Sequence, residues 1–95
     1  MTYYMYCILD KRIDRFNAPV FKTEDPDQVA EMARAGYLTQ DPSRREVALD
    51  LYQVGTFDSK TGQTDILPSM RLVASNAVFE EECKNVLQEQ PAKAD

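Results

Sequence analysis

Residues 3–9 are apolar or aromatic at every position, so an extended chain would present such side chains on both of its faces. Aromatic and β-favouring residue types dominate this stretch. We therefore predict a strand that is buried on both faces. Residues 10–15 are polar and predict an exposed turn, and Phe16, Val20 and Phe21 then resume an apolar pattern as a short edge strand or extended segment.

The next pattern is helical and begins with a capping signal. Asp25 is followed by Pro26 and, three residues after Asp25, by Gln28, which is the spacing of an N-cap, a first-turn proline and a capping box. Apolar residues then recur at helical spacing. Gly36 stands where a left-handed C-terminal cap is expected, so the pattern predicts a helix over residues 26–35.

A second β region follows a polar connection. Residues 37–46 favour a loop, although the Asp-Pro pair within them is also typical of a short helical turn over residues 41–45. Apolar and polar residues alternate over residues 47–57, which favours a strand over a helix. Gly55 is a candidate for a bulge within that strand.

The most specific local signal is a turn. Asp58 begins and Gly62 ends a five-residue segment that is typical of a type I turn with a glycine bulge. Residues 63–67 are therefore expected to fold back antiparallel. Pro68 argues against an uninterrupted central strand, so residues 70–73 are expected to form a further edge strand.

The last segment is an amphipathic helix with an acidic start. Asn76 can cap this helix, and three consecutive Glu residues lie near its positive end. Its apolar stripe consists of Phe79, Cys83, Val86 and Leu87. Beyond the stripe, residues 88–95 have the composition of a frayed tail.

Together these elements predict an α+β domain: an antiparallel sheet of four to five strands, one packed helix and a C-terminal amphipathic helix. Residues 1–76 would form the core domain, and residues 77–95 the C-terminal helix and tail of the same domain. The predicted core consists of Met5, Cys7, Leu9, Phe21, Val29, Met32, Leu49, Leu51, Val54, Phe57, Ile66 and Leu72.

Composition narrows the function classes. The 95 residues contain no His and two Cys, which excludes the usual zinc patterns and every His-dependent catalytic arrangement within one chain. The carboxylates of Asp10, Asp50 and Asp58 match no metal-ligand spacing, and the turn already accounts for Asp58. We therefore expect neither an enzyme nor a cofactor or metal. No apolar run is long enough to span a membrane, so we expect a soluble cytosolic protein without membrane contact.

Charge is unevenly distributed along the chain, whose formal net charge is −5. Residues 1–23 contain four basic and two acidic residues, whereas residues 77–95 contain five acidic and two basic residues. The N-terminal part is therefore locally basic although the whole chain is acidic. Local patches govern contacts within a Debye length, so a basic surface remains available for an acidic partner.

Two blocks resemble a known family. The first is residues 6–11 followed by Phe16, Pro19 and Phe21, and the second is residues 51–62 with their Leu-Tyr-x-x-Gly-x-Phe-Asp-x-x-Thr-Gly pattern. They make the chain similar to the small nonstructural protein of gokushovirus-type single-stranded DNA phages (Microviridae). The resemblance covers about residues 3–73 and excludes the acidic final helix. The first turn also departs from the family, whose members commonly have a glycine there.

The resemblance implies a non-enzymatic accessory protein of the host cytoplasm, with a DNA-binding role between genome replication and packaging. Binding of single-stranded DNA needs cationic side chains for phosphates and exposed rings for bases. The candidates are Lys11, Arg12, Arg15, Arg44, Arg45 and Lys60 for phosphates, and Tyr4, Tyr6, Phe16 and Tyr52 for bases. The bland interpretation is that these bases are solvated and these rings belong to the core.

An alternative function is an acidic, dimeric protein-interaction module. The apolar stripe of Phe79, Cys83, Val86 and Leu87 would then form the interface of a homodimer, and the adjacent Glu residues would face a basic phage or host protein. The competing interpretation is that these Glu residues only stabilise the start of their own helix. We expect a homodimer under either function.

Overall fold

The computed structural model describes the backbone of residues 1–93 and the side chains up to residue 85. It contains one five-stranded antiparallel sheet and two α-helices, which confirms the predicted α+β fold. The elements in chain order are β1 (Thr2–Asp10), β2 (Arg15–Phe16), β3 (Val20–Lys22), α1 (Pro26–Thr39), the 3-10 turn η1 (Pro42–Arg44), β4 (Leu49–Asp58), β5 (Thr64–Ser75) and α2 (Asn76–Lys93).

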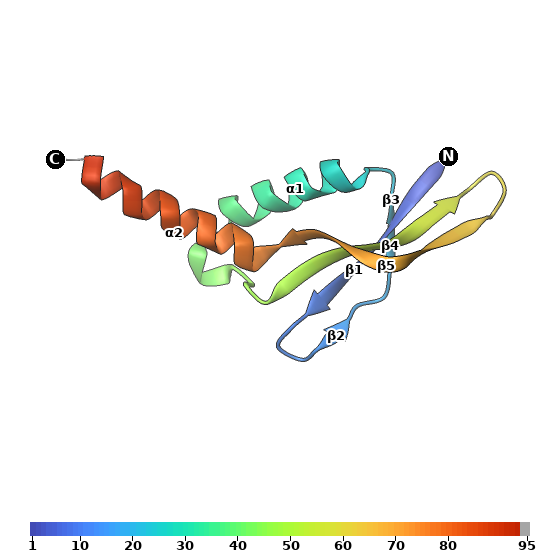
Figure 1. The fold of residues 1–95 in the computed structure, drawn as a ribbon, viewed down its shortest axis with the longest axis horizontal. Helices are drawn as coiled ribbons and strands as arrows, with labels where there is room; N and C mark the ends of the chain where they lie inside the picture. Colours follow the sequence, from blue (N-terminus) through green and yellow to red (C-terminus); the bar gives the residue numbers. More distant parts are fainter. Residues whose placement is uncertain (94–95) are drawn as a thin grey trace.

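Strand β1 lies in the middle of the sheet. It pairs with β4 along one side and with the two short strands β2 and β3 along the other, and β4 in turn pairs with β5. The sheet therefore has two different edges: one is the long strand β5 and the other is the interrupted pair β2 and β3 (Figure 1).

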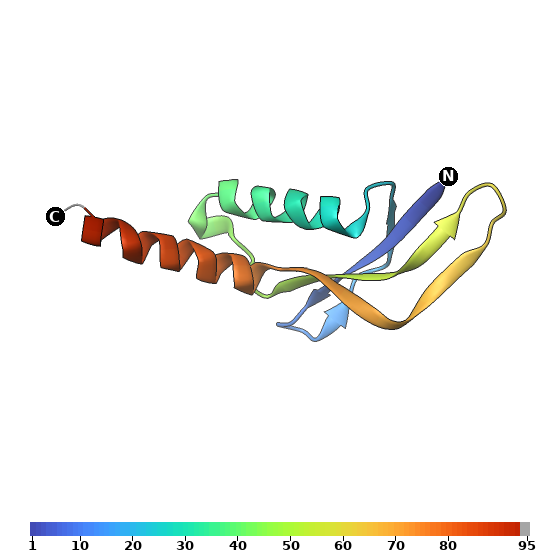
Figure 2. The same ribbon diagram turned by 45° about the horizontal axis from the view of Figure 1, so that its top comes forward.

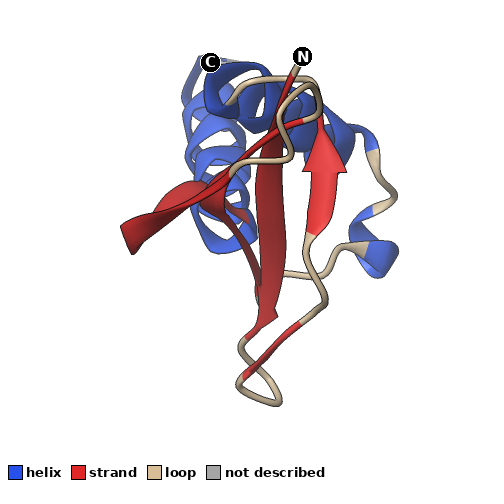
Figure 3. Ribbon diagram, turned by 90° about the vertical axis from the view of Figure 1, so that its right-hand side faces the viewer, coloured by secondary structure: helices blue, strands red, loops and turns tan. Residues whose placement is uncertain are grey.

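Helix α1 lies over one face of the sheet, above the strands in Figure 2, and α2 packs beside α1 at the end of the sheet. Figure 3, seen from the hairpin end, shows both helices behind the strands. Helix α2 continues directly from β5 and extends beyond the sheet, so the molecule is elongated, with a longest dimension of 61 Å. No described element lies over the opposite face, where Phe16 and Phe21 are about half exposed.

The hairpin between β4 and β5 closes as the sequence predicts. The N–H of Gly62 donates to the carbonyl of Asp58 at 2.7 Å, and the N–H of Asp58 donates to the carbonyl of Gln63 at 2.9 Å. The Asp58 carboxylate also accepts the N–H of Lys60 at 2.8 Å, which lowers the pKa of Asp58. Gly62 has a φ of 77°, a conformation that glycine adopts without a steric penalty.

Strand β5 bends in its middle. The ladder is regular up to Gly55 opposite Ile66 and resumes with Gln53 opposite Arg71, so four residues of β5 face one residue of β4. Gly55 confirms the predicted bulge. The two strands predicted around Pro68 are a single strand, which tolerates the proline because β5 is an edge strand.

Helix α1 begins as predicted and ends later. The capping box is formed: the N–H of Gln28 donates to Asp25 Oδ1 at 2.9 Å, and the N–H of Asp25 donates to Gln28 Oε1 at 3.0 Å. The predicted left-handed cap at Gly36 is wrong, because the helix continues to Thr39. Glycine costs a helix interior about 1 kcal/mol, and burial of the next residue, Tyr37, offsets that cost.

The core lies between the helices and one end of the sheet. Tyr37 of α1, Ala74 of β5 and Phe79 of α2 form a buried cluster, and the Tyr37 and Phe79 rings are 5.9 Å apart. The predicted core members Met5, Cys7 and Val29 are buried. The prediction is wrong for Phe21, Met32, Ile66 and Leu72, each of which is about half exposed or more.

Three smaller predictions can be compared with the structure. The connection after α1 contains η1, whose Asp41 side chain accepts the N–H of Ser43 at 3.1 Å, and this bond lowers the pKa of Asp41. Strand β4 begins at Leu49, two residues later than predicted. The predicted frayed tail is helical as far as Lys93, and its last two residues lie outside the described part of the chain.

Candidate nucleic-acid interface

Strand alternation divides the aromatic side chains between the two faces of the sheet. Leu51 packs against the helix cluster and pairs directly with Ile8, so Ile8 and Tyr6 lie on the face that the helices cover. Tyr3 and Met5 consequently lie on the opposite, uncovered face. Directly paired residues of an antiparallel ladder share a face, so the register places the remaining rings.

Four further aromatic residues join Tyr3 on the uncovered face. The pairs that place them are Phe57 with Tyr3, Phe21 with Met5, Tyr52 with Cys7 and Phe16 with Leu9. We call the five rings of Tyr3, Phe16, Phe21, Tyr52 and Phe57 the aromatic face. It extends along the sheet from the first turn to the β4–β5 hairpin, over four strands.

The aromatic face contains two groups of rings. At the hairpin end, the Phe57 ring centre is 5.9 Å from that of Phe21 and 6.5 Å from that of Tyr3, and the three side chains line a pocket of about 280 Å³. At the other end, Phe16 and Tyr52 meet edge to face at 5.8 Å. Phe21 is 52% exposed and Phe16 is 44% exposed, so each group offers ring surface to a ligand.

The predicted stacking role of Tyr6 is wrong. Its side chain is fully buried, and its hydroxyl donates to the carbonyl of Glu24 at 2.8 Å. Burial, together with the nearby Asp25 carboxylate, raises the pKa of Tyr6 to about 12. Tyr4 is half-buried on the same side of β1, opposite the aromatic face, so neither of the two predicted tyrosines belongs to the site.

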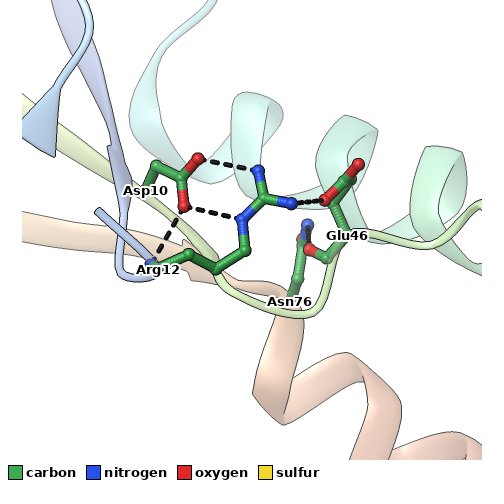
Figure 4. A network of polar contacts seen from close by, with 4 residues as sticks. All are labelled: Asp10, Arg12, Glu46 and Asn76. Carbon is green, nitrogen blue, oxygen red and sulfur yellow. Dashed lines mark hydrogen bonds and ion pairs between the residues drawn. The ribbon is translucent and has the colours of Figure 1, made fainter. Parts of the chain in front are cut away.

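Arg12 is held by two carboxylates, as Figure 4 shows. Its guanidinium contacts both oxygens of Asp10, at 3.0 and 2.7 Å, and Glu46 at 2.9 Å. These contacts lower the pKa of Asp10 and raise that of Arg12. Asn76 donates to the Glu46 carbonyl at 2.8 Å, so the network ties the first turn to the start of α2. The predicted phosphate contact is therefore already neutralised within the chain.

Two more predicted phosphate contacts have partners within the chain. The ammonium of Lys11 lies 3.4 Å from the buried Asp50 carboxylate. Arg45 donates to the Leu38 carbonyl at 3.2 Å, lies 3.6 Å from Glu80, and stacks over the Tyr37 ring at 5.3 Å. Arg45 therefore holds the helices together, and the prediction that it binds phosphate is wrong.

The other candidate bases remain accessible. Within residues 1–85, no carboxylate lies at ion-pair distance from Arg15, Arg44 or Lys60. Arg15 precedes the Phe16 ring, and Lys60 stands in the hairpin turn that follows the strand of Phe57. Arg44 lies in η1, on the connection between α1 and the sheet.

Sequence reasoning missed part of the site. Tyr3 was assigned to a strand buried on both faces, and Phe21 and Phe57 to the core, whereas all three line the exposed pocket. Lys22 directly follows Phe21 and is a fourth exposed base, but it pairs with Tyr4 and so lies on the opposite side of the sheet edge. The register between β1 and β4 reveals the grouping of Tyr3 with Phe57. The hairpin signal could not supply it, because that turn joins β4 to β5 and not to β1.

The acidic residues gather away from the aromatic face. The strands and turns within residues 2–22 and 49–75 contain six basic and five acidic residues, whereas α1 and α2 contain three basic and six acidic residues. Because α1 lies over the opposite face and α2 extends beyond the end of the sheet, this negative charge lies away from the aromatic face. The field at the aromatic face is therefore less repulsive to phosphates than the net charge suggests.

The predicted dimer interface is wrong in part. Phe79 is 7% exposed because it packs against Tyr37 in the core of its own chain. Cys83 is half-buried in the second turn of α2. Val86 and Leu87, the other members of the predicted stripe, lie outside the described side chains. Phe79 therefore stabilises the docking of α2 and is not available to a second copy.

Comparisons with known proteins do not indicate a function, so the functional assignment rests on these side chains. Neither a family model, nor a curated protein, nor a solved structure matches the chain. In the part that the structure describes, no cluster of three or more candidate ligands could hold a metal ion. None of the described helices combines the length and apolar content that crossing a membrane requires.

Proposed function

We propose that the protein binds single-stranded DNA without catalysing a reaction, using the aromatic face as its stacking surface. The observation that carries this proposal is the presence of five rings on a sheet face that no described element covers. Bases of a single strand stack on such rings for about 1–3 kcal/mol each, whatever their sequence. A duplex keeps its bases stacked on one another, so it would not use this surface.

The bases around the aromatic face would contact phosphates. Arg15 and Lys22 lie on the edge strands β2 and β3, next in sequence to Phe16 and Phe21. They pair with Asp10 and Tyr4, so they project to the side opposite the rings and would contact a strand that wraps around this edge. Lys60 lies at the hairpin end. Three phosphate contacts predict that the logarithm of the binding constant falls with the logarithm of salt concentration with a slope of about −2. Stacking, which salt screens little, would supply most of the affinity.

The resemblance to the gokushovirus nonstructural protein supports the same conclusion. It suggests a phage accessory protein that acts on single-stranded genomes in the host cytoplasm, between replication and packaging. A surface that holds single strands without reading their sequence suits such a role, because a genome must be handled along its whole length.

A fluorescence anisotropy titration of a labelled 30-nucleotide single strand tests the proposal. We expect the wild type to bind the single strand and not the duplex of the same sequence. Phe16→Ala and Phe21→Ala should each weaken binding about 5- to 100-fold, the loss of one stacked base. Met32→Ala is the matched control, because Met32 is 53% exposed on α1 and away from the aromatic face.

Two results would contradict the proposal. One is the absence of single-strand binding at low salt, which would favour the acidic helix side as a surface for a basic protein. The other is binding that survives both phenylalanine substitutions, which would place the DNA elsewhere on the molecule. Circular dichroism of each variant shows whether its fold is retained.

A further inference from the structure

The chain exposes more surface than a compact monomer of its size. Its accessible surface is 6712 Å² for a mass of 10.9 kDa. A compact protein of this mass exposes about 5,600 Å², which leaves an excess of about 1,100 Å². The radius of gyration of 16.2 Å likewise exceeds the about 12 Å of a compact domain of this length. This excess has two sources, α2 extending beyond the sheet and the uncovered face of the sheet, and it is larger than the about 800 Å² that a standard interface buries per partner.

The two edges of the sheet differ in how they are protected. The edge formed by β2 and β3 has strands of only two and three residues, separated by a segment with Pro19 and carrying Arg15 and Lys22. Short strands, charges and proline are the features that prevent pairing between edges. This edge is therefore unsuited to adding another strand.

The edge formed by β5 also carries a proline, Pro68, and two register irregularities, but its strand is long and continues beyond both the proline and the bend. The strand has 12 residues, and Ile66 and Leu72, which pair with Gly55 and Tyr52, extend the apolar surface of the uncovered face out to this edge, where they are 65% and 52% exposed. Between Ile66 and the end of the strand, the only charged residue is Arg71. A long apolar edge of this kind is a site where a second strand pairs. Pro68 lacks an N–H and limits such pairing to the part of the strand that follows it.

We propose that β5 pairs antiparallel with β5 of a second copy of the chain, through residues 69–75 around a two-fold axis. Such an interface is self-complementary, because each copy contributes the same edge. Charge favours this choice of surface. Each chain has a net charge of −5, and two acidic helix surfaces would repel each other, whereas two β5 edges bring only one base each. Val78, 54% exposed in the first turn of α2, extends the apolar surface next to this segment.

The dimer would join two sheets into one. A two-fold axis perpendicular to the sheet leaves both aromatic faces on the same side, so neither is covered by the contact. This consequence rests on the proposed function: a dimer would offer a single strand two stacking surfaces in succession, and its binding site would be twice as long as that of a monomer. The dimer itself does not depend on DNA.

Light scattering after size-exclusion chromatography, on the full chain without DNA, tests the interface. We expect twice the chain mass of 10.9 kDa at micromolar concentration. Three variants each place a lysine at an exposed apolar position: Met70→Lys on the β5 edge, Phe21→Lys on the aromatic face and Ile13→Lys in the first turn. Only Met70→Lys should weaken the dimer, by tenfold or more.

A second measurement does not depend on the stability of that variant. In a Cys83→Ser background, which retains only the buried Cys7, one cysteine is added at a time at positions 69–72. At least one of them should form a disulfide-linked dimer, because residues near the axis face their own copies within about 4.4–6.8 Å. Phe21→Cys should not cross-link. Three results would overturn the proposal. The first is a wild type that stays monomeric up to 100 micromolar. The others are a dimer that Phe21→Lys dissociates and Met70→Lys does not, and cross-linking at position 21 alone. None of these readouts involves DNA, so DNA binding can fail while the dimer stands, and the reverse.

Discussion

Replacing Gly55 with alanine should push β5 away from β4 and lower the free energy of unfolding. An added Cβ would overlap the carbonyl oxygen of Asp65 and lie 3.2 Å from the Cα of Ile66. Both are backbone atoms of the paired strand, so neither can rotate out of the way as a side chain would. Forced overpacking of this kind costs about 1–3 kcal/mol. We expect a loss near the upper end, which for a domain of this size lowers Tm by about 12–24 °C.

The other two glycines provide matched controls for the same substitution. Gly36 has no atom within 4 Å of an added Cβ and lies inside α1, so Gly36→Ala should stabilise the fold by about 0.5–1 kcal/mol. Gly62 also has open space but a φ of 77°, so Gly62→Ala should cost about 1–2 kcal/mol through backbone strain alone. Urea unfolding followed by far-UV circular dichroism gives all three values. A Gly55→Ala variant as stable as the wild type would refute the reasoning about this bulge.

Two further predictions concern the polar contacts. The pKa of Tyr6 is raised from 10 to about 12, so folding favours its neutral form, and this contribution is present below pH 10 and lost as the pH rises to 12. The stability advantage of the wild type over Tyr6→Phe, measured by unfolding across that range, should shrink by about 2–3 kcal/mol; a constant difference would argue against a shifted pKa. Asp10→Asn combined with Glu46→Gln removes both carboxylate partners of the Arg12 guanidinium. The logarithm of the single-strand binding constant should then fall more steeply with the logarithm of salt concentration, by about 0.7 in slope. An unchanged slope would show that Arg12 does not reach the strand.

Local sequence signals predicted local structure well. The capping box at Asp25 and the turn from Asp58 to Gly62 each specify a few backbone hydrogen bonds between near neighbours, and these bonds are formed. The end of α1 was missed because it depends on a distant residue. The helix passes Gly36 so that Tyr37 can pack against Phe79, more than 40 residues further along the chain.

The functional face could not be assigned from alternation alone. Along β1 both sets of alternating side chains are aromatic or apolar, so the pattern does not show which set the helices cover. Tyr6 is covered, and Tyr3 is not. The same ambiguity placed Phe21 in the core. Ion pairs were equally hidden, because Arg12 and Glu46 are remote in sequence and meet only through the sheet and the start of α2.

The measurement that tests the central claim most directly is an NMR titration of the labelled protein with a short single strand. Binding on the aromatic face should shift the ring signals of Phe16, Phe21, Tyr52 and Phe57 while leaving the amide signals of the outer side of α1 unchanged. Shifts confined to α1 and α2, or no shifts at a DNA concentration well above that of the protein, would contradict the assignment of this face to single-stranded DNA.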